Sequence, residues 1–278
     1  MAAVAAVPMQ YSAPAKLNLF LHVTGRRPDG FHDLETIFQL VDLADTVTVR
    51  TRDDGRIVRE PAPDDALLAT LADEEDLTVR AARLLQQHSG TGLGASIHVH
   101  KRIPAGGGMG GGSSDAATVL RALNEQWGLH WPLERLAALG LQLGSDVPVF
   151  VHGHDAFARG RGEQLQALQL PSSWYLVVHP GVAVSTREIF CAPELTRDTQ
   201  PLKIPGLPPD GGRNDCEPVV RARYPQVAQA LDLLSAQRAR LTGTGACVFV
   251  AATSQAAAAQ LAIGLPAAWR SFVVRSLA

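Results

Sequence analysis

The sequence predicts an α+β protein of two domains, in which alternating strands are mixed with amphipathic helices. Residues 16–23 and 95–103 alternate along the chain, and a period of two is typical of a half-buried strand. Between residues 116 and 127, apolar side chains instead recur at helical spacing until Gly128. Half-buried strands are typical of antiparallel or mixed sheets. The pattern therefore favours α+β over a doubly wound parallel sheet.

The first half begins with the strand over 16–23, whose polar face carries Lys16 and Asn18, so that both can point at one ligand. The elements expected after it are a turn at 24–30, a strand at 35–41, a hairpin of 46–50 and 56–59 around Asp53-Asp54-Gly55, a helix over 76–87, the strand over 95–103, a helix after residue 112 capped by Ser113 or Ser114, a helix over 133–143 and an apolar strand over 147–151.

Gly160-Arg-Gly162 marks the expected change of domain, which gives an N-terminal domain over 1–158 and a C-terminal domain over 159–278. The elements expected in the second half are a strand at 175–179, a loop rich in proline and glycine at 205–213, a helix at 227–234, a strand at 247–251, a helix at 255–263 and a last strand at 272–275.

Composition sets limits on function. The formal net charge is −2, which gives no support for a broad surface that binds nucleic acid or membrane. The three cysteines lie far apart, at 191, 216 and 247, and predict neither a disulfide framework nor a Cys-x-x-Cys metal site. Because residues 2–7 are short and follow no basic residue, we expect no signal peptide and a cytoplasmic protein. No apolar run has the length of a membrane span.

The most informative segment is a glycine-rich loop, since six of the 25 glycines fall between Gly106 and Gly112. Glycine lets backbone amides approach a ligand, and the N-terminus of the following helix attracts anions, so the segment predicts a phosphate site. It matches the dinucleotide fingerprint literally, but the preceding strand alternates and no acidic residue ends a second strand about 20 residues on. A Walker A loop would need Gly-Lys-Ser/Thr, and a protein-kinase loop would be followed by a strand. A flexible linker would not lie directly between strand and helix.

Two histidine pairs, His98-x-His100 and His152-x-His154, each place two imidazoles on one expected strand face. Zinc sites usually add several acidic or cysteine ligands, and Asp155 alone lies beside one of these pairs in the sequence. We therefore expect no zinc site there.

Several separated segments together resemble the GHMP small-molecule kinases, over nearly the whole chain from about residue 14 to residue 250. The segments are Pro14-Ala-Lys-Leu-Asn-Leu-Phe-Leu with Gly30-Phe-His32, the loop Pro104 to Ala117, Gly144-Ser-Asp-Val-Pro-Val-Phe150, Gly160-Arg-Gly-Glu163, His179-Pro-Gly181, Asn214-Asp-Cys-Glu217 and Leu241-Thr-Gly-Thr-Gly-Ala-Cys-Val-Phe249. The glycine loop marks the superfamily. The first segment and Asn214-Asp-Cys-Glu217 resemble the branch whose substrate is a cytidine-diphosphate-linked methylerythritol.

This resemblance implies a fold of two lobes, an N-terminal one like ribosomal protein S5 domain 2 and a C-terminal ferredoxin-like one, with the active site in the cleft between them. It implies transfer of the γ-phosphoryl group of ATP to the C2 hydroxyl of that substrate, with Mg²⁺, on the way to isoprenoids. Ser114 is the candidate contact for Mg²⁺, and the sequence specifies no other metal ligand. The state of assembly implied is a monomer or a homodimer.

The resemblance also implies residue roles. The catalytic pair would be Lys16 and Asp146. The ATP-binding residues would be Lys101, Pro104, Ala105, Gly106, Gly107, Gly108, Met109, Gly110, Gly111, Gly112, Ser113 and Ser114. The substrate-binding residues would be Asn18, Phe31, His32 and Thr186, and a second loop facing the phosphates would comprise Gly243, Thr244 and Gly245.

Elementary chemistry is consistent with these roles. A tertiary alcohol is a hindered nucleophile of high pKa and needs a base within hydrogen-bond reach, which Asp146 can supply. Lys16 can offset negative charge during transfer, while most of the rate comes from positioning and electrostatics. Phe31 offers a ring to stack on cytosine, and His32 offers a donor and an acceptor to the base edge.

Taken singly, each residue has an ordinary structural interpretation. Asp146 fits a turn or cap, Lys16 a solvated strand lysine, and His32 a loop histidine bonded to backbone. Asn18 and Thr186 are unremarkable polar residues, and Gly243-Thr-Gly245 fits a plain tight turn. Only the match of all these segments together to the GHMP kinases favours functional roles for these residues.

The chain departs from the family pattern at three places. Phe31 stands where tyrosine is usual, Asp76-Leu77 where Asn-Leu is common, and Met109 where leucine is common. The first removes a hydroxyl contact but keeps the ring, and the second changes the adenine pocket.

Two alternative functions remain. One is a GHMP kinase for another alcohol, such as mevalonate or homoserine, against which Phe31 and His32 argue. The other is a non-catalytic nucleotide-binding relative, against which Lys16 and Asp146 argue.

Overall fold

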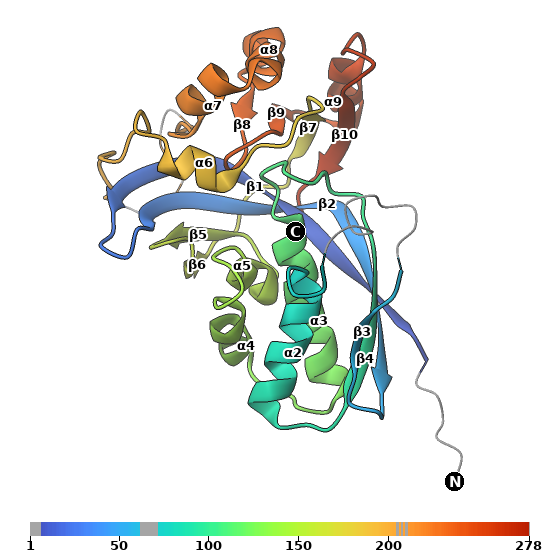
Figure 1. Cartoon of the computed structure of the whole chain (residues 1–278). Helices are drawn as coiled ribbons and strands as arrows, with labels where there is room; N and C mark the ends of the chain where they lie inside the picture. Colours follow the sequence, from blue (N-terminus) through green and yellow to red (C-terminus); the bar gives the residue numbers. More distant parts are fainter. Residues whose placement is uncertain (1–6, 62–71, 204–205, 207, 209–210, 278) are drawn as a thin grey trace. The chain divides into compact units, whose positions relative to one another are not determined.

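A computed structural model describes residues 7–61, 72–203, 206, 208 and 211–277 (Figure 1). The chain forms two compact units, each discontinuous in sequence. The first unit comprises 1–14, 44–102 and 111–153, and the second comprises 15–43, 103–110 and 154–278. The divisions fall within β1 (Met9–Arg26), within β2 (His32–Arg52) and within the glycine-rich loop. Strands and helices occur in both units, so the predicted α+β class is confirmed.

The sheet of the first unit combines the end of β2 with β4 (Gly94–His100) and β3 (Ile57–Arg59). β2 pairs antiparallel with β4, from Thr46 opposite His100 to Arg52 opposite Gly94. β3 pairs with the other edge of β4, and in parallel. The predicted hairpin around Asp53-Asp54-Gly55 is therefore wrong, because β4, which comes later in the chain, lies between the two strands.

The first unit also contains the start of β1 and, among its described residues, four helices. They are α2 (Leu77–Ser89), α3 (Gly111–Gln126), α4 (Leu133–Gly140) and α5 (Val147–His152). α2 and α3 run side by side (Figure 1). α2 begins at Asp76, whose carboxylate accepts from the amides of Thr78 and Val79, and ends at Gly90 in the left-handed region.

Two further predictions in the first unit are wrong. Residues 147–151 are helical, as α5, whereas an apolar strand was expected. Pro148 occupies the first turn, where its missing N–H costs nothing, and Gly153 ends the helix in the left-handed region. In addition, α3 begins at Gly111, so Ser113 and Ser114 lie inside its first turn and are not its cap.

The second unit is built around an antiparallel sheet of four strands in the order β10-β7-β9-β8. Their bounds are Arg270–Arg275, Trp174–His179, Val248–Ala252 and Arg240–Leu241. Its helices are α6 (Thr186–Cys191), α7 (Glu217–Arg223), α8 (Pro225–Leu233) and α9 (Gln255–Ala262), with a 3₁₀ turn at Ser235–Gln237. The strands and helices predicted in this half are confirmed within a few residues. The expected loop at 205–213 lies partly outside the described residues.

β1 and β2 also enter the second unit, where β2 pairs with β5 (Ala156–Arg159), and β5 pairs with β6 (Gln164–Ala167). Every residue of β1 from Ala15 to Val23 is buried, including the predicted polar face with Lys16 and Asn18. The expectation of a half-buried strand is therefore wrong. The alternation separates two buried environments, one apolar and one lined by polar groups.

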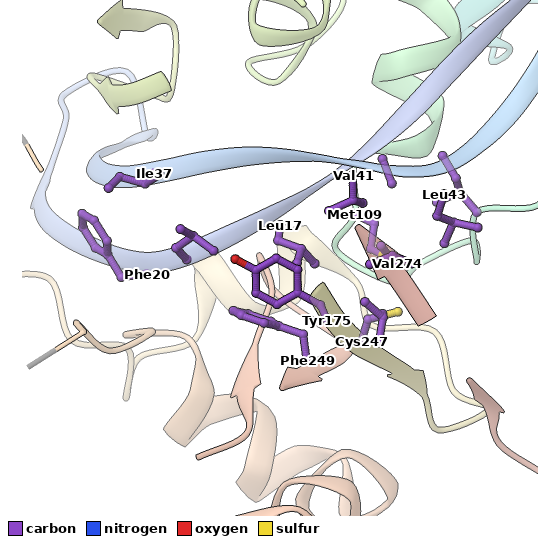
Figure 2. Packing of buried hydrophobic residues seen from close by; sticks show 14 of the residues in the cluster. Leu17, Phe20, Ile37, Val41, Leu43, Met109, Tyr175, Cys247, Phe249 and Val274 are labelled. Carbon is purple, nitrogen blue, oxygen red and sulfur yellow. The ribbon is translucent and has the colours of Figure 1, made fainter. Parts of the chain in front are cut away.

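The glycine-rich loop rests on the main apolar core of the second unit. Ile103 and Met109 anchor it there, and both side chains are almost fully buried. Figure 2 shows Met109 among side chains of β1, β2 and the four-stranded sheet, namely Leu17, Val41, Leu43, Tyr175, Phe249 and Val274, together with Cys247, which directly precedes β9. Burial of these two side chains anchors the loop to this core.

Candidate active site

The glycine-rich loop requires glycine at particular positions. Gly106 and Gly108 have φ of +64° and +73°, which side chains rarely adopt. A Cβ on Gly108 would lie 2.2 Å from the carbonyl oxygen of Thr242, and one on Gly107 would lie 2.8 Å from Cys247 Sγ. The glycines therefore allow the loop to lie directly against the chain around Thr242 to Cys247.

The carbonyl groups of this loop point into the protein. Gly106 and Gly107 oxygens accept from the amides of Ala246 and Cys247 at 2.9 and 3.1 Å, and Met109 oxygen accepts from the amide of Lys16 at 3.0 Å. Within the described part of the chain, the amides of residues 106–110 donate to no protein acceptor. A run of amides left free on the outer side of a glycine loop is suited to bind phosphate oxygens.

Lys16 carries its charge to the same loop. Its ammonium donates to the carbonyl oxygen of Gly108 at 2.8 Å and to Asn18 Oδ1, and it lies 5.5 Å from the centre of the Phe38 ring. The Asn18 amide donates in turn to Thr36 Oγ1 at 2.8 Å. Lys16 is 3% exposed, so it is not the solvated lysine of the ordinary interpretation. This geometry places a cation directly beneath the loop.

The second glycine loop, Gly243-Thr244-Gly245, lies against the first. A Cβ on Gly243 would be 2.8 Å from the oxygen of Gly108, and Gly243 has a φ of +56°. Asn214 holds this loop, because its side-chain amide donates to the carbonyls of Gly243 at 2.7 Å and Leu241 at 3.0 Å. Thr244 contacts Thr186 through their hydroxyl oxygens, 3.0 Å apart. The two predicted glycine loops and Thr186 therefore come together within the second unit.

The remaining predicted substrate residues also belong to the second unit. His32 is buried, stacks on Phe190 with ring centres 5.3 Å apart, and accepts a hydrogen bond from Arg197. Burial, and then the positive charges of Arg197 and Arg26, lower the pKa of His32. Phe31 is half exposed, and the guanidinium of Arg161 lies 4.6 Å from its ring centre. An exposed ring beside a buried neutral imidazole is suited to bind a planar base.

The first unit contains the start of α3 and Asp146. Asp146 is half-buried and immediately precedes α5, without capping it. A Cβ on Gly144 would lie 3.7 Å from Ser113 Oγ, so the segment that carries Asp146 passes beside the first turn of α3. Ser114 is fully buried, and within the described part of the chain its hydroxyl has no hydrogen-bond partner. Lys16 and Asp146 thus belong to different units.

Lys101 binds two buried carboxylates of the first unit. Its ammonium pairs with Asp45 and lies 2.7 Å from Asp115 Oδ2. Asp45 also accepts from the amide of Arg102. Burial raises the pKa of Asp115 to about 7, although the Lys101 charge opposes that shift. This cluster joins the strand side of the glycine-rich loop to the helix that follows the loop.

Clusters of three or more possible metal ligands do not occur among the residues that the structure describes. Among the same residues, no helix combines the length and the apolar character of a membrane span.

Sequence reasoning gave no role to several residues that support the site, namely Asp45, Asp115, Arg197, Asn214 and Thr242. Asn214 had a signal, since it belongs to a segment that resembles the family. Asp115 follows Ser114 directly but had no role assigned. Asp45 and Arg197 have no local motif that points to the site, because Lys101 lies 56 positions from Asp45 and His32 lies 165 positions from Arg197.

Comparison with known proteins identifies the family. The family model "GHMP kinases N terminal domain" matches residues 76–154, and "GHMP kinases C terminal" matches residues 209–271. A 4-diphosphocytidyl-2-C-methyl-D-erythritol kinase from Halorhodospira halophila is 53% identical over 271 residues, covering 96% of this chain and 92% of the relative. The chain belongs to the GHMP kinase family. The protein of the same name from Thiobacillus denitrificans is 54% identical, covering 96% of this GHMP kinase and 95% of the relative.

Comparison with solved structures agrees with this family assignment. A crystal structure of a 4-(cytidine 5'-diphospho)-2C-methyl-D-erythritol kinase superposes on this GHMP kinase with a TM-score of 0.79 at 33% identity, covering 97% of this chain and all of that one. A mevalonate kinase from Methanococcus jannaschii gives a TM-score of 0.70 at 15% identity, covering 99% of this chain and all of that one, which shows a shared fold alone. The resemblance predicted from sequence, and with it the two-lobed GHMP kinase fold, is confirmed.

Proposed function

We propose that this GHMP kinase transfers the γ-phosphoryl group of ATP to the C2 hydroxyl of 4-diphosphocytidyl-2-C-methyl-D-erythritol, in the methylerythritol phosphate pathway of isoprenoid biosynthesis. One observation carries the proposal. Relatives that are 53% and 54% identical over nearly the whole chain are kinases named for this substrate. The kinase activity and the use of ATP follow from the family.

The glycine-rich loop supports a role in binding the triphosphate. Its carbonyls are engaged inside the protein and its amides are free of described protein acceptors, so negatively charged oxygens can be bound without displacing any internal bond. The buried ammonium of Lys16 adds a positive charge on the inner side of the loop. Phosphoryl transfer is accelerated mainly by such positioning and charge, because charge spreads over the oxygens in the transition state. We propose residues 104–114 as the ATP-binding segment.

We propose Asp146 as the general base and Lys16 as its charged counterpart. The C2 hydroxyl is tertiary, and its proton must leave as the bond to phosphorus forms. Asp146 lies before α5 without capping it, and Pro148 and the buried start of that helix fix its backbone. Thr186 and Asn18 are proposed substrate contacts, together with Phe31 and His32. Lys101 remains a proposed ATP contact, and its two carboxylate partners hold it in place.

We also propose Mg²⁺ as the metal that accompanies ATP. Mg²⁺ prefers oxygen ligands and retains several waters, so one protein hydroxyl can suffice beside the phosphates. The Ser114 hydroxyl, which is buried and has no partner in the described part of the chain, fits such a ligand. When bound, the metal would neutralise charge on the phosphate oxygens.

Several further properties are proposals of the same kind. The net charge of −2 supports a small-molecule substrate over nucleic acid or a membrane surface. The three widely spaced cysteines, two of them buried, support a cytoplasmic location. We propose a monomer or a homodimer. We also keep domain limits at 1–158 and 159–278, alongside the discontinuous units of the structure.

A direct assay separates the proposed function from its alternatives. The purified protein is incubated with ATP and Mg²⁺ and with one alcohol at a time: the cytidylylated methylerythritol, mevalonate or homoserine. We expect ADP release with the first substrate alone. Turnover of either other alcohol in its place would identify a different GHMP kinase. Nucleotide binding with no turnover of any of the three would indicate a non-catalytic relative.

A further inference from the structure

Arg197 connects the segment after α6 to His32. Its Nε donates to His32 Nε2 at 3.0 Å. The rest of the guanidinium donates to four backbone carbonyls, those of Phe190, Ala192, Pro193 and Leu195, at 3.1, 2.6, 3.4 and 2.9 Å. A side chain held by this many bonds has one orientation. The direction in which Nε points is therefore fixed by the backbone around it.

This contact determines which nitrogen of His32 carries the proton. A guanidinium stays charged and can only donate, so its partner must offer a lone pair. His32 Nε2 is therefore unprotonated, and in the neutral ring the proton lies on Nδ1. An imidazolium would carry a proton on Nε2 as well, and two N–H groups would then face each other. The distance of 3.0 Å between Arg197 Nε and His32 Nε2 leaves no room for both protons.

The surroundings of His32 favour the same state. The side chain is 7% exposed and stacked on Phe190. The charged groups that face it are Arg197, Arg26 and Asp33, and burial together with the two arginines lowers the pKa of His32 against the opposing effect of Asp33. Within the described residues, Nδ1 donates to no protein acceptor and is not among the fully enclosed polar atoms. The Nδ1–H is left available to a ligand.

We propose that Arg197 is a positioning residue that fixes His32 as the Nδ1–H tautomer, so that His32 selects a base whose edge offers a ring-nitrogen acceptor. This inference rests on the proposed function, in which the base is cytosine. Cytosine N3 has a lone pair, whereas N3 of uracil carries a proton that would oppose the Nδ1–H. A site that donates to a substrate acceptor rejects the analogue that lacks it, because a buried donor is then left unpaired. The specificity for the base thus originates in a residue that need not touch it.

The tautomer is measured without any substrate. Full-length protein labelled with ¹⁵N-histidine is examined by long-range ¹H–¹⁵N correlation at neutral pH, and the His32 signals are assigned with His32→Ala. We expect an unprotonated Nε2 and a protonated Nδ1. In Arg197→Met we expect a mixture of tautomers and a higher His32 pKa. Arg223→Met is the matched control, because Arg223 pairs with Glu194 in the same segment but does not contact His32. The control should leave the His32 signals unchanged.

Kinetics test the consequence. For Arg197→Met we expect KM for the cytidylylated substrate to rise about 10-fold, with kcat changed less than about 2-fold and KM for ATP unchanged. The preference over the uridine analogue should fall by a similar factor, and the control should match the wild type. A wild-type His32 protonated on Nε2, or charged at pH 7, would overturn the proposal even if Arg197→Met failed to fold. If the tautomer is as expected but the enzyme ignores the cytidylylated substrate, the proposed function fails and the tautomer assignment stands.

Discussion

Replacement of Gly108 by alanine tests whether contact between the two glycine loops shapes the phosphate site. Gly108 has a φ of +73°, and placing a side chain there costs about 1–2 kcal/mol. The new Cβ would lie 2.2 Å from the carbonyl oxygen of Thr242. That oxygen cannot easily move, because it accepts from the amide of Gly245 at 2.9 Å.

The magnitude follows from the size of this overlap. A carbon and a carbonyl oxygen approach to about 3.3 Å at closest, so the loop must shift by about 1 Å. A shift of about 1 Å in a reacting group can lower the rate about 100-fold. We therefore expect Gly108→Ala to lower kcat/KM for ATP about 100-fold, and to lower the free energy of unfolding by about 1–2 kcal/mol.

Gly90→Ala is the matched control. Gly90 has nearly the same φ, +68°, but a Cβ there would meet nothing within 4 Å. This variant should show a similar loss of stability in urea unfolding, with unchanged steady-state kinetics. If Gly108→Ala kept kcat/KM within about 3-fold of the wild type, or if Gly90→Ala lost as much activity, the argument from loop contact would be refuted.

Three further outcomes are expected. Asp146→Asn should lower kcat about 100-fold or more while calorimetric ATP affinity stays within about 3-fold, and near-normal turnover would remove Asp146 as the base. Asn214→Ala leaves the buried carbonyls of Gly243 and Leu241 unpaired. It should cost about 2–3 kcal/mol in urea unfolding, and a loss below about 0.5 kcal/mol would argue against that role. The Asp115 carboxyl, whose pKa is raised to about 7, binds a proton more tightly when folded, so wild-type stability should fall as the pH rises from about 4 to about 7. The Asp115→Asn variant has no carboxyl to titrate at this position, so its free energy of unfolding relative to wild type should increase between pH 5 and pH 8. A difference that does not change with pH would show that the Asp115 carboxyl does not titrate in this range.

Local sequence patterns predicted most elements, and they failed where distant segments decide the outcome. The alternation of β1 gave its strand type and the shared face of Lys16 and Asn18. It could not show that this polar face is buried, because some of the residues that cover it come much later, Gly108 lying 92 positions after Lys16 and Thr242 lying 224 positions after Asn18. The hairpin at Asp53-Asp54-Gly55 failed for the same reason, since β4 separates the two strands. A short apolar run such as 147–151 has no period that separates strand from helix.

The candidate site likewise contains residues that the sequence predicts and residues that it does not. Glycine spacing and the family resemblance were enough to single out both glycine loops and Lys16. Arg197 and Asp45 could not be found, because the residues through which they reach the site, His32 and Lys101, lie 165 and 56 positions away. Lys101 was assigned to ATP alone, and the carboxylates that bind it become visible only when the strand and helix on either side of the loop are folded.

The central claim is that phosphate moves from ATP to one hydroxyl of one nucleotide-linked alcohol. ³¹P NMR of the reaction with the cytidylylated methylerythritol measures this directly. We expect the γ-phosphate signal of ATP to disappear as ADP and a new phosphomonoester form, with the substrate diphosphate intact. Because the tertiary carbon C2 bears no hydrogen, the ester signal should show no three-bond proton coupling, whereas an ester at a primary or secondary hydroxyl would be split. Unchanged ATP, or an ester at another hydroxyl, would contradict the account.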